Sequence, residues 1–288
     1  MPRRHNTLPR RYQAGFSADG SGAIWVFDRQ QQCIRQSNPA STAVEKDFYG
    51  WKYSRNTNPG SIESFLANHI EGPFWPVLDR LDAQRGPDSN DRLRLAFFCA
   101  FLLTRVPRFH SSISTLYASG VAENPHLKQA IPYFDRVFER SQKGLLLPAA
   151  SKNLTLKKMV ELGKRAGEYL LALDTHLMSA SPEEPFITTD NPFALVRING
   201  KSEKATVTAP GFLRWVPLSA RTAVGFGEPG DNFFWTNIPP AKGRRLNVAL
   251  AAVASHLIIA STKSQLEEIV RGLPREAPDQ NTCPVEIF

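Results

Sequence analysis

The stretch DRLRLAFFCAFLLT, residues 91–104, sets the main constraint on how the rest of the chain folds. Wound as a helix, it presents apolar side chains on nearly every face, which a surface helix does not tolerate. Its longest apolar run, 95–103, is far shorter than the about 20 residues that span a bilayer. We therefore predict a helix through the core that buries Leu93, Leu95, Phe97, Phe98, Phe101, Leu102 and Leu103.

The segments before this stretch predict a hairpin and an amphipathic helix. Residues 24–28, IWVFD, are β-branched or aromatic and come after a turn sequence, which is typical of a strand, and residues 33–34 open the return strand. From Ser61, apolar residues recur at helical spacing until the Gly-Pro pair at 72–73 ends the pattern. His69 lies on this apolar stripe, so we expect a buried histidine with satisfied hydrogen bonds.

The segments after it change from helical to β-rich character. Helices are predicted at 127–140 and 154–177. After Pro182, short strands are predicted at 186–189, 194–198, 205–208 and 223–226, followed by a helical or mixed segment at 246–259 and a short helix at 265–271.

This order of elements predicts an α+β fold rather than regular βαβ alternation. We expect an N-terminal β-hairpin, a central helical bundle, and a C-terminal antiparallel or mixed sheet with terminal helices. Residues 1–288 are interpreted as a single domain with an irregular tail from about 274. The alternative is a subdivision into a mostly helical part, 1–180, and a β-rich part, 181–288.

Charge and cysteine content narrow the classes of function. Lys and Arg number 35 against 27 Asp and Glu, a formal net charge of +8, which is compatible with RNA, DNA or a nucleotide as partner. A modestly basic surface also serves solubility alone. The three cysteines, Cys33, Cys99 and Cys283, form no CxxC pair, which argues against a disulfide framework or a thiolate zinc site. The basic start has no apolar segment behind it, so we expect a cytoplasmic protein that does not enter the membrane.

The common enzyme motifs are missing from the sequence. The GFGEPG stretch at 225–230 has the spacing of a dinucleotide loop, but Pro229 interrupts it and no helical pattern comes after it. P-loop, HExxH, GxSxG and kinase signatures do not occur. Arg105 and His110 have the R-x4-H spacing of HEPN-type ribonucleases, yet Pro107 would break the helix that presents both. Arginines near the end of a helix also complement its dipole, without any catalytic role.

Several short blocks resemble one family over nearly the whole chain. The opening His5-x3-Pro9-x2-Tyr12-x3-Phe16, continued by IWVFDR at 24–29, is similar to the start of the bacterial domain of unknown function 4238 family. Further landmarks occur in the same order: DFY at 47–49, IE at 70–71, PVL at 76–78, Arg105-x-Pro107, FITTDNP at 186–192 and PLS at 217–219. The resemblance implies a fold and a set of residues, but no reaction.

Five residues from distant segments form a candidate catalytic set: His5, Glu71, Arg105, Asp190 and Asn191. Together they supply a titratable base, two carboxylates, a fixed cation and an amide donor, as hydrolytic sites do. In this hypothesis His5 is a general base or metal ligand, Arg105 clamps a phosphate, and Asp190 orients His5 or binds a divalent ion. The structural alternatives are that His5 caps a neighbouring element and that Asp190 and Asn191 form only an Asx turn. Glu71 falls about 180° from the apolar stripe of its helix, so it is either solvated or turned toward a cleft.

Basic residues near both ends of the chain are candidate phosphate ligands. Besides Arg105, they are Arg3, Arg4, Lys242, Arg244 and Arg245. The last three precede or open the predicted helix around Leu246, where the macrodipole favours an anion among them. The alternative is that these side chains extend into water.

We therefore expect a hydrolase acting on RNA or a nucleotide phosphate, in the manner of a nuclease toxin or phage-defence effector. The alternative is a non-catalytic module that binds nucleic acid or protein. The sequence requires no cofactor, is compatible with Mg²⁺ or Mn²⁺, identifies no metal ligands, and leaves the oligomeric state open.

Overall fold

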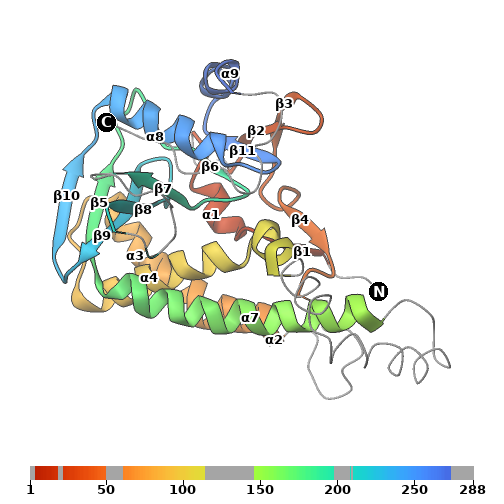
Figure 1. The fold of residues 1–288 in the computed structure, drawn as a ribbon. Coiled ribbons are helices and arrows are strands. Elements are labelled where there is room, and N and C mark those ends of the chain that lie inside the picture. The colour runs from red at the N-terminus through yellow and green to blue at the C-terminus, as the bar shows by residue number, and fades with distance from the viewer. Residues whose placement is uncertain are drawn as a thin grey trace.

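A computed structural model describes residues 4–18, 22–49, 61–113, 146–197, 208 and 210–273 of the chain. Its fold is α+β, with a layer of long helices beside mixed and antiparallel sheets (Figure 1). The predictions for 127–140, for 205–207 and for the tail from 274 lie outside the described residues.

The helical layer is built around the predicted core helix, α4. It spans Ser89–Thr104, and Asp88 and Asp91 form a capping box at its start. Residues 95–102 are buried except for the partly buried Phe97, whereas Leu93 is 46% exposed and falls outside the core. The other helices of this layer are α2 (Ser61–Phe65), the π-helix η1 (Leu66–Glu71), α3 (Gly72–Asp82) and α7 (Leu146–Leu171).

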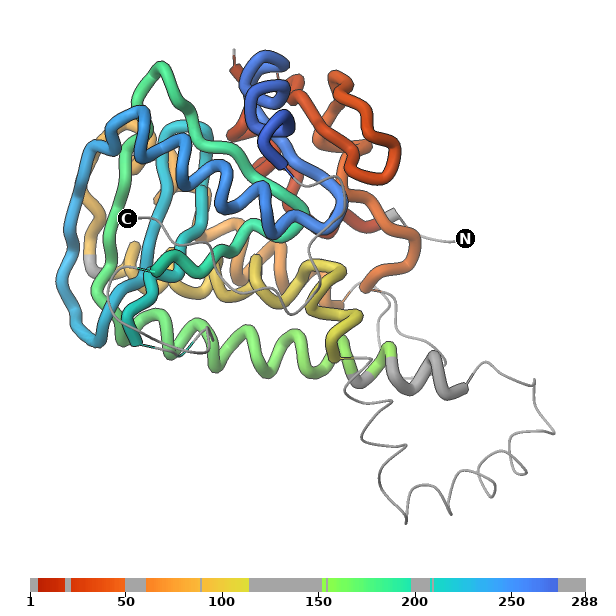
Figure 2. The backbone as a smooth tube through the Cα atoms, turned by 45° about the horizontal axis from the view of Figure 1, so that its top comes forward, coloured from red at the N-terminus to blue at the C-terminus, as the bar shows by residue number. Residues whose placement is uncertain are grey.

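Two glycines allow α7 to lie directly against the aromatic face of α4. A Cβ at Gly163 would come within 2.8 Å of Phe101, and one at Gly167 within 2.9 Å of Phe97. Any side chain at either position would therefore force the helices apart or displace a ring. Figures 1 and 2 show α4 and α7 running alongside each other over much of their length.

The sequence predicted that the helix beginning at Ser61 ends at Gly72, and this prediction is wrong. The helix passes through η1 into α3 with helical backbone angles at Glu71 and Gly72, and Pro73 lies in the first turn of α3. A π-helical turn inserts an extra residue and rotates the next helical turns by about 100° relative to an uninterrupted α-helix. Because of this change in phase, the prediction for His69 is also wrong: its side chain is exposed.

Three sheets are formed within the described residues. The five-stranded sheet has the order β10-β5-β9-β8-β7 and is mixed, because β10 pairs parallel to β5 and the other pairs are antiparallel. The four-stranded sheet, β3-β2-β11-β6, is antiparallel, and β1 and β4 form a small antiparallel pair. The strands are β1 (Arg4–Asn6), β2 (Ile24–Asp28), β3 (Cys33–Ser37), β4 (Val44–Lys46), β5 (Leu173–Ser179), β6 (Thr188–Thr189), β7 (Ala194–Arg197), β8 (Phe212–Pro217), β9 (Thr222–Pro229), β10 (Phe233–Asn237) and β11 (Leu257–Ala260).

The five-stranded sheet buries both of its faces. On one face, Val216, Val224 and Phe226 join the cluster that contains the α4 side chains. On the other face, Trp215 and Ala223 join a second cluster with apolar residues of α8 (Pro240–Ala252) and α9 (Lys263–Arg271). Successive residues of a strand point to opposite faces, so alternation along β8 and β9 supplies both clusters. The remaining helix, α1 (Arg10–Ala14), precedes the hairpin.

The predicted hairpin of β2 and β3 is confirmed, and it shares a sheet with the C-terminal strand β11. The long helix predicted at 154–177 is wrong at its C-terminal end: α7 ends at Leu171 and β5 begins at Leu173. Leu173 and Leu177 are four residues apart, a spacing that fits one face of a helix and also one face of a strand. Both side chains are buried in the sheet. Strands β1, β4, β8 and β10 were not predicted, and the segment predicted as helical or mixed at 246–259 contains the end of α8 and the start of β11.

None of the helices in the described ranges is long and apolar enough to cross a membrane.

Candidate functional site

Arg105 lies where the core helix stops. It is the C-cap residue of α4, and a second helical segment, 107–113, starts at Pro107. The predicted break at this proline is confirmed, because the proline ring disfavours helical geometry in the residue before it. The break lets the side chain of Arg105 turn inward, where only 5% of the residue is exposed.

All three nitrogens of the Arg105 guanidinium donate hydrogen bonds inside the protein. Nε donates to the Tyr49 hydroxyl at 3.1 Å, one terminal nitrogen to Glu71 Oε1 at 2.6 Å, and the other to the Asn6 carbonyl oxygen at 3.1 Å. Burial opposes the charge on Arg105, but Tyr49 and Glu71 outweigh it and raise the pKa of the guanidinium. On Tyr49 burial has the opposite effect: it raises the pKa of the hydroxyl, and the charge of Arg105 lowers it by less. The hydrogen bonds of Arg105 use three of the five N–H groups of the guanidinium, and the side chain is buried.

Glu71 reaches Arg105 because of the π-helical turn. It is the last residue of η1, and its side chain is 18% exposed. An unbroken α-helix would have placed it opposite the apolar stripe, and the shift of about 100° brings it toward the core side instead. Of the two positions that the sequence allowed, solvated or inward, the structure shows the inward one.

His5 joins the same group through Tyr49. It lies in β1 and is 2% exposed, and its Nδ1 accepts a hydrogen bond from the Tyr49 backbone N–H at 3.0 Å. Its Nε2 is buried and lies 3.6 Å from Oε2 of Glu63, whose side chain is 51% exposed. Since Nδ1 is an acceptor, a neutral His5 must carry its proton on Nε2. The Nε2 proton then faces Glu63 at a distance too long for a hydrogen bond, and Nε2 has no hydrogen-bond partner among the described residues. A role as base or metal ligand through Nε2 would need the other tautomer.

We call His5, Tyr49, Glu63, Glu71 and Arg105 the Arg105 cluster. Tyr49 and Glu63 were not among the predicted site residues. Tyr49 could have been found, because it ends the DFY block of the family resemblance, whereas no signal in the sequence marks Glu63.

Asp190 and Asn191 lie in a different environment, at the end of β6. The Asp190 carboxylate accepts hydrogen bonds from the backbone N–H groups of Ser255, at 3.0 Å, and His256, at 2.8 Å. Burial raises the pKa of Asp190, and the backbone donors lower it by less. The amide of Asn191 donates to the Val253 carbonyl oxygen at 3.4 Å. We call these residues the Asp190 turn; in the described part of the chain, no hydrogen bond or ion pair joins its carboxylate to the Arg105 cluster.

The predicted Asx turn at this place is made by the neighbouring threonine instead. The hydroxyl of Thr189 accepts from the Asn191 N–H at 3.1 Å and donates to the Asn191 carbonyl oxygen at 2.7 Å. This leaves the Asp190 side chain available to hold the loop between α8 and β11.

The segment 107–113 links the two groups. Arg108 donates to the Val253 carbonyl oxygen at 3.4 Å, the same atom that Asn191 contacts. Two residues further on, the ring of His110 packs on Phe48, beside Tyr49, with ring centroids 4.2 Å apart. Burial, with a contribution from Lys152, lowers the pKa of His110 to about 4, so this imidazole is neutral at pH 7.

Those predicted phosphate ligands whose side chains the structure describes do not gather around Arg105. Arg3 lies outside the described residues, as does the side chain of Arg4 in β1. Lys242, Arg244 and Arg245 are exposed in the first turns of α8, where Arg244 pairs with Glu268 at 2.9 Å. Helical rise places Arg244 about 14 Å along the axis from Val253, the end of α8 that meets the Asp190 turn.

Within the ranges that the structure describes, no group of three His, Cys, Asp or Glu side chains is arranged to hold a metal ion.

The comparison with family models confirms the resemblance seen in the sequence. A model described as a protein of unknown function, DUF4238, matches residues 4–264. Neither the curated proteins nor the solved structures give a significant match. Because the match covers most of its length, the chain belongs to the DUF4238 family.

Proposed function

We propose that this protein is a hydrolase that acts on RNA or on a nucleotide phosphate, and that His5 transfers the proton in the reaction. The observation that carries this proposal is the buried His5 ring, which is fixed by the Tyr49 N–H and has its other nitrogen beside Glu63. Histidine is the side chain that most often transfers protons in hydrolytic sites, and here a carboxylate lies beside its Nε2.

Glu63 connects this proton to the outside of the protein. Its carboxylate is half-exposed and lies 3.6 Å from the buried Nε2 of His5, so a small approach of the two side chains would let a proton pass between the ring and solvent by way of Glu63. Arg105 acts here as a positioning residue, because its bonds to Tyr49 and Asn6 fix the two segments that flank His5.

The choice of a phosphate substrate rests on charge. The chain carries a net charge of +8, and arginines lie on both sides of His5 in sequence. Arg10 is exposed and donates to the side chain of Asn6, next to His5, at 3.3 Å. An exposed cation that makes only a weak surface contact is more accessible to an incoming phosphate than the buried Arg105.

The test is incubation of the purified protein with total cellular RNA and with mixed nucleotides, with and without Mg²⁺ or Mn²⁺. We expect discrete products, and a rate at least about 100-fold lower for His5→Ala and for Glu63→Gln. His69→Ala is the matched control, because this imidazole is exposed on the neighbouring helical turn. Intact substrates under every condition, or a His5→Ala variant that is fully active, would overturn the proposal. Thermal unfolding separates loss of chemistry from loss of fold.

A non-catalytic nucleic-acid-binding module is the second candidate, and the exposed cations of α8 favour it. Lys242, Arg244 and Arg245 lie within four residues of one another, and no acidic residue is in the first turn of that helix. This function predicts RNA binding that weakens steeply between about 50 and 200 mM salt, without products. Replacement of all three by Gln should reduce the salt dependence, while replacement of Lys157 and Lys164, exposed on α7, should not.

A further inference from the structure

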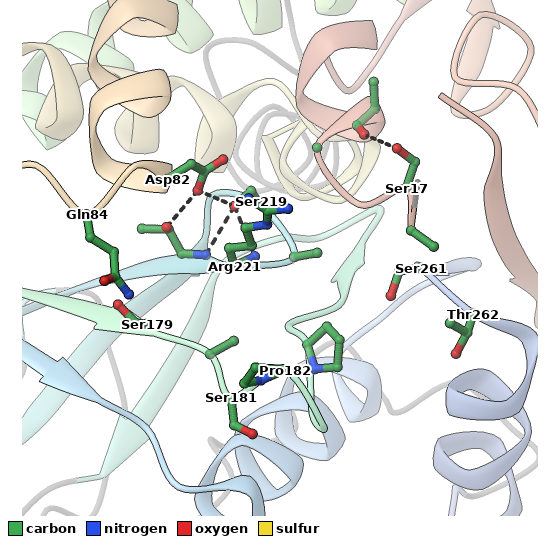
Figure 3. Close-up of a pocket in the computed structure, with 17 residues that line it drawn as sticks. Ser17, Asp82, Gln84, Ser179, Ser181, Pro182, Ser219, Arg221, Ser261 and Thr262 are labelled. Atoms are coloured by element: carbon green, nitrogen blue, oxygen red, sulfur yellow. Dashed lines mark hydrogen bonds between the residues drawn. The ribbon is translucent and has the colours of Figure 1, made fainter. Parts of the chain in front are cut away.

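A polar cleft lies apart from both the Arg105 cluster and the Asp190 turn. Its volume is about 1050 Å³, at the upper end of the usual range for small-molecule sites. Five segments meet around it: the end of α1, the end of α3, the end of β5, the turn between β8 and β9, and the junction of β11 with α9 (Figure 3). Among the described residues that line it, none belongs to either of those two groups.

One wall of the cleft is fixed by internal hydrogen bonds. Asp82 accepts from the hydroxyls of Ser219, at 2.7 Å, and Thr222, at 2.6 Å. Ser219 also accepts the backbone N–H groups of Arg221 and Thr222 at 3.1 Å. These bonds hold the wall in place, and both hydroxyls donate to Oδ1 of Asp82, which keeps its negative charge.

The opposite wall holds a polar atom that the protein does not satisfy. Ser261 is 5% exposed, and its Oγ has no hydrogen-bond partner among the described residues. Figure 3 shows this hydroxyl directed toward the interior of the cleft. Buried hydroxyls are almost always hydrogen-bonded, so an unpaired one at a cleft wall is a position where a water or a ligand atom in the cleft completes the hydrogen bonding.

The next residue starts a helix whose positive end meets the same cleft. Thr262 is the N-cap of α9 and lines the cleft, and its hydroxyl accepts from the Gln265 N–H at 3.2 Å. The helix has nine residues and no acidic residue in its first turn, so its dipole and the nearby amides favour an anion there. Arg221, exposed on the facing turn, adds a cation to the lining.

The remaining lining residues indicate what else the ligand carries. They are hydroxyl, amide, proline and small residues, and no aromatic side chain is among those that the structure describes there. Such a surface offers hydrogen bonds to hydroxyl groups but no platform on which a nucleobase could stack. We propose that the cleft binds a small phosphorylated sugar or polyol, with its phosphate at the start of α9 and in contact with Ser261.

The experiment is calorimetric titration of the whole protein with ribose 5-phosphate, ribose and inorganic phosphate. We expect saturable binding of ribose 5-phosphate, and at least tenfold weaker binding of each of the other two compounds. Ser261→Ala should weaken the binding of ribose 5-phosphate at least tenfold without lowering the thermal midpoint, because its hydroxyl has no partner to lose. Ser41→Ala, at an exposed serine away from the cleft, is the matched control and should bind as the unmodified protein does.

Arg221→Gln is a second variant, at an exposed position that the fold does not need. It should weaken the binding of ribose 5-phosphate but not that of ribose. Ribose that binds as tightly as its phosphate would overturn the anion assignment, and inorganic phosphate that binds as tightly would overturn the sugar assignment. No saturable binding, or binding unchanged in both variants, would overturn the site. These outcomes are independent of His5 and of RNA cleavage.

Discussion

Glu71 and Asp190 are both shielded acidic residues, and the protein satisfies them in opposite ways. In the Arg105 cluster, Glu71 faces a guanidinium at 2.6 Å, so a negative charge is cancelled by a positive one. In the Asp190 turn, the carboxylate accepts hydrogen bonds from backbone N–H groups. A nearby cation is Arg29: burial lowers the pKa of its guanidinium, and the charge of Asp190 raises it by less. The first region therefore depends on a partner side chain, whereas the second depends on the conformation of a loop.

Removal of the partner side chain should be the most destabilising change. Arg105→Met should lower the free energy of unfolding by about 3–5 kcal/mol, because it leaves Glu71 without its counter-charge and Tyr49 without its donor. Chemical denaturation at pH 7 measures this loss. Arg11→Met is the control, since its ion pair with Asp79 at 2.7 Å is exposed and should contribute less than about 1 kcal/mol. Equal losses in the two variants would show that the Arg105 cluster is no more than a surface ion pair.

A second effect concerns the segment that lies between the two regions. His110 has a pKa of about 4 in the folded protein and an ordinary value after unfolding, so the unfolded chain binds more protons between about pH 4 and 6.5. Stability should therefore be fully present above about pH 6.5 and fall by about 2–3 kcal/mol as the pH drops to about 4. His110→Gln should lose this part of the pH dependence. Parallel denaturation series for the two proteins make the test, and identical slopes would contradict it.

The third effect concerns Asp190. It is smaller than that of His110, and its contribution to stability changes with pH in the opposite direction. Asp190→Asn should lower the free energy of unfolding by about 1–2 kcal/mol. The new amide NH₂ would face a backbone N–H from which the carboxylate accepted a hydrogen bond. The native pKa of Asp190 is raised, so between the usual value of about 3.9 and the native value the folded state binds more protons. Stability of the unmodified protein relative to the variant should therefore fall as the pH rises through that window. A relative stability that rises with pH would show that the backbone donors outweigh burial.

The sequence predicted the elements whose patterns are unambiguous. The apolar helix α4, the hairpin of β2 and β3, and the helix α9 all agree with local periodicity. Errors occurred where two patterns fit equally: Leu173 and Leu177 suit a helix or a strand, and only their place in the five-stranded sheet decides between them. The π-helical turn of η1 has no signature in the sequence, so the position of Glu71 and the exposure of His69 could not be derived.

The candidate site was predictable only in part, for a related reason. Three of the residues chosen for their chemistry, His5, Glu71 and Arg105, lie in one cluster. Their partners are set by long-range contacts, such as the Tyr49 N–H on His5 and the loop at Ser255 on Asp190, which no spacing in the sequence encodes. Ser261 was missed because its unpaired hydroxyl is a property of the cleft and not of the residue.

The smallest expected effect is the coupling free energy between Glu71 and Asp190, which decides whether the Arg105 cluster and the Asp190 turn form one network. Glu71→Gln and Asp190→Asn, made singly and together, give a double-mutant cycle in the free energy of unfolding. If Glu71 is balanced by Arg105 and Asp190 by its loop, the two losses should add to within about 0.5 kcal/mol, the usual limit for sites without shared partners. The link through Arg108 and the Val253 carbonyl oxygen is the route by which they could couple, so Arg108→Gln in the same cycle shows whether it carries any coupling. A coupling above about 1 kcal/mol that Arg108→Gln removes would join Asp190 to the Arg105 cluster. The five residues predicted from the sequence would then act as a single electrostatic unit.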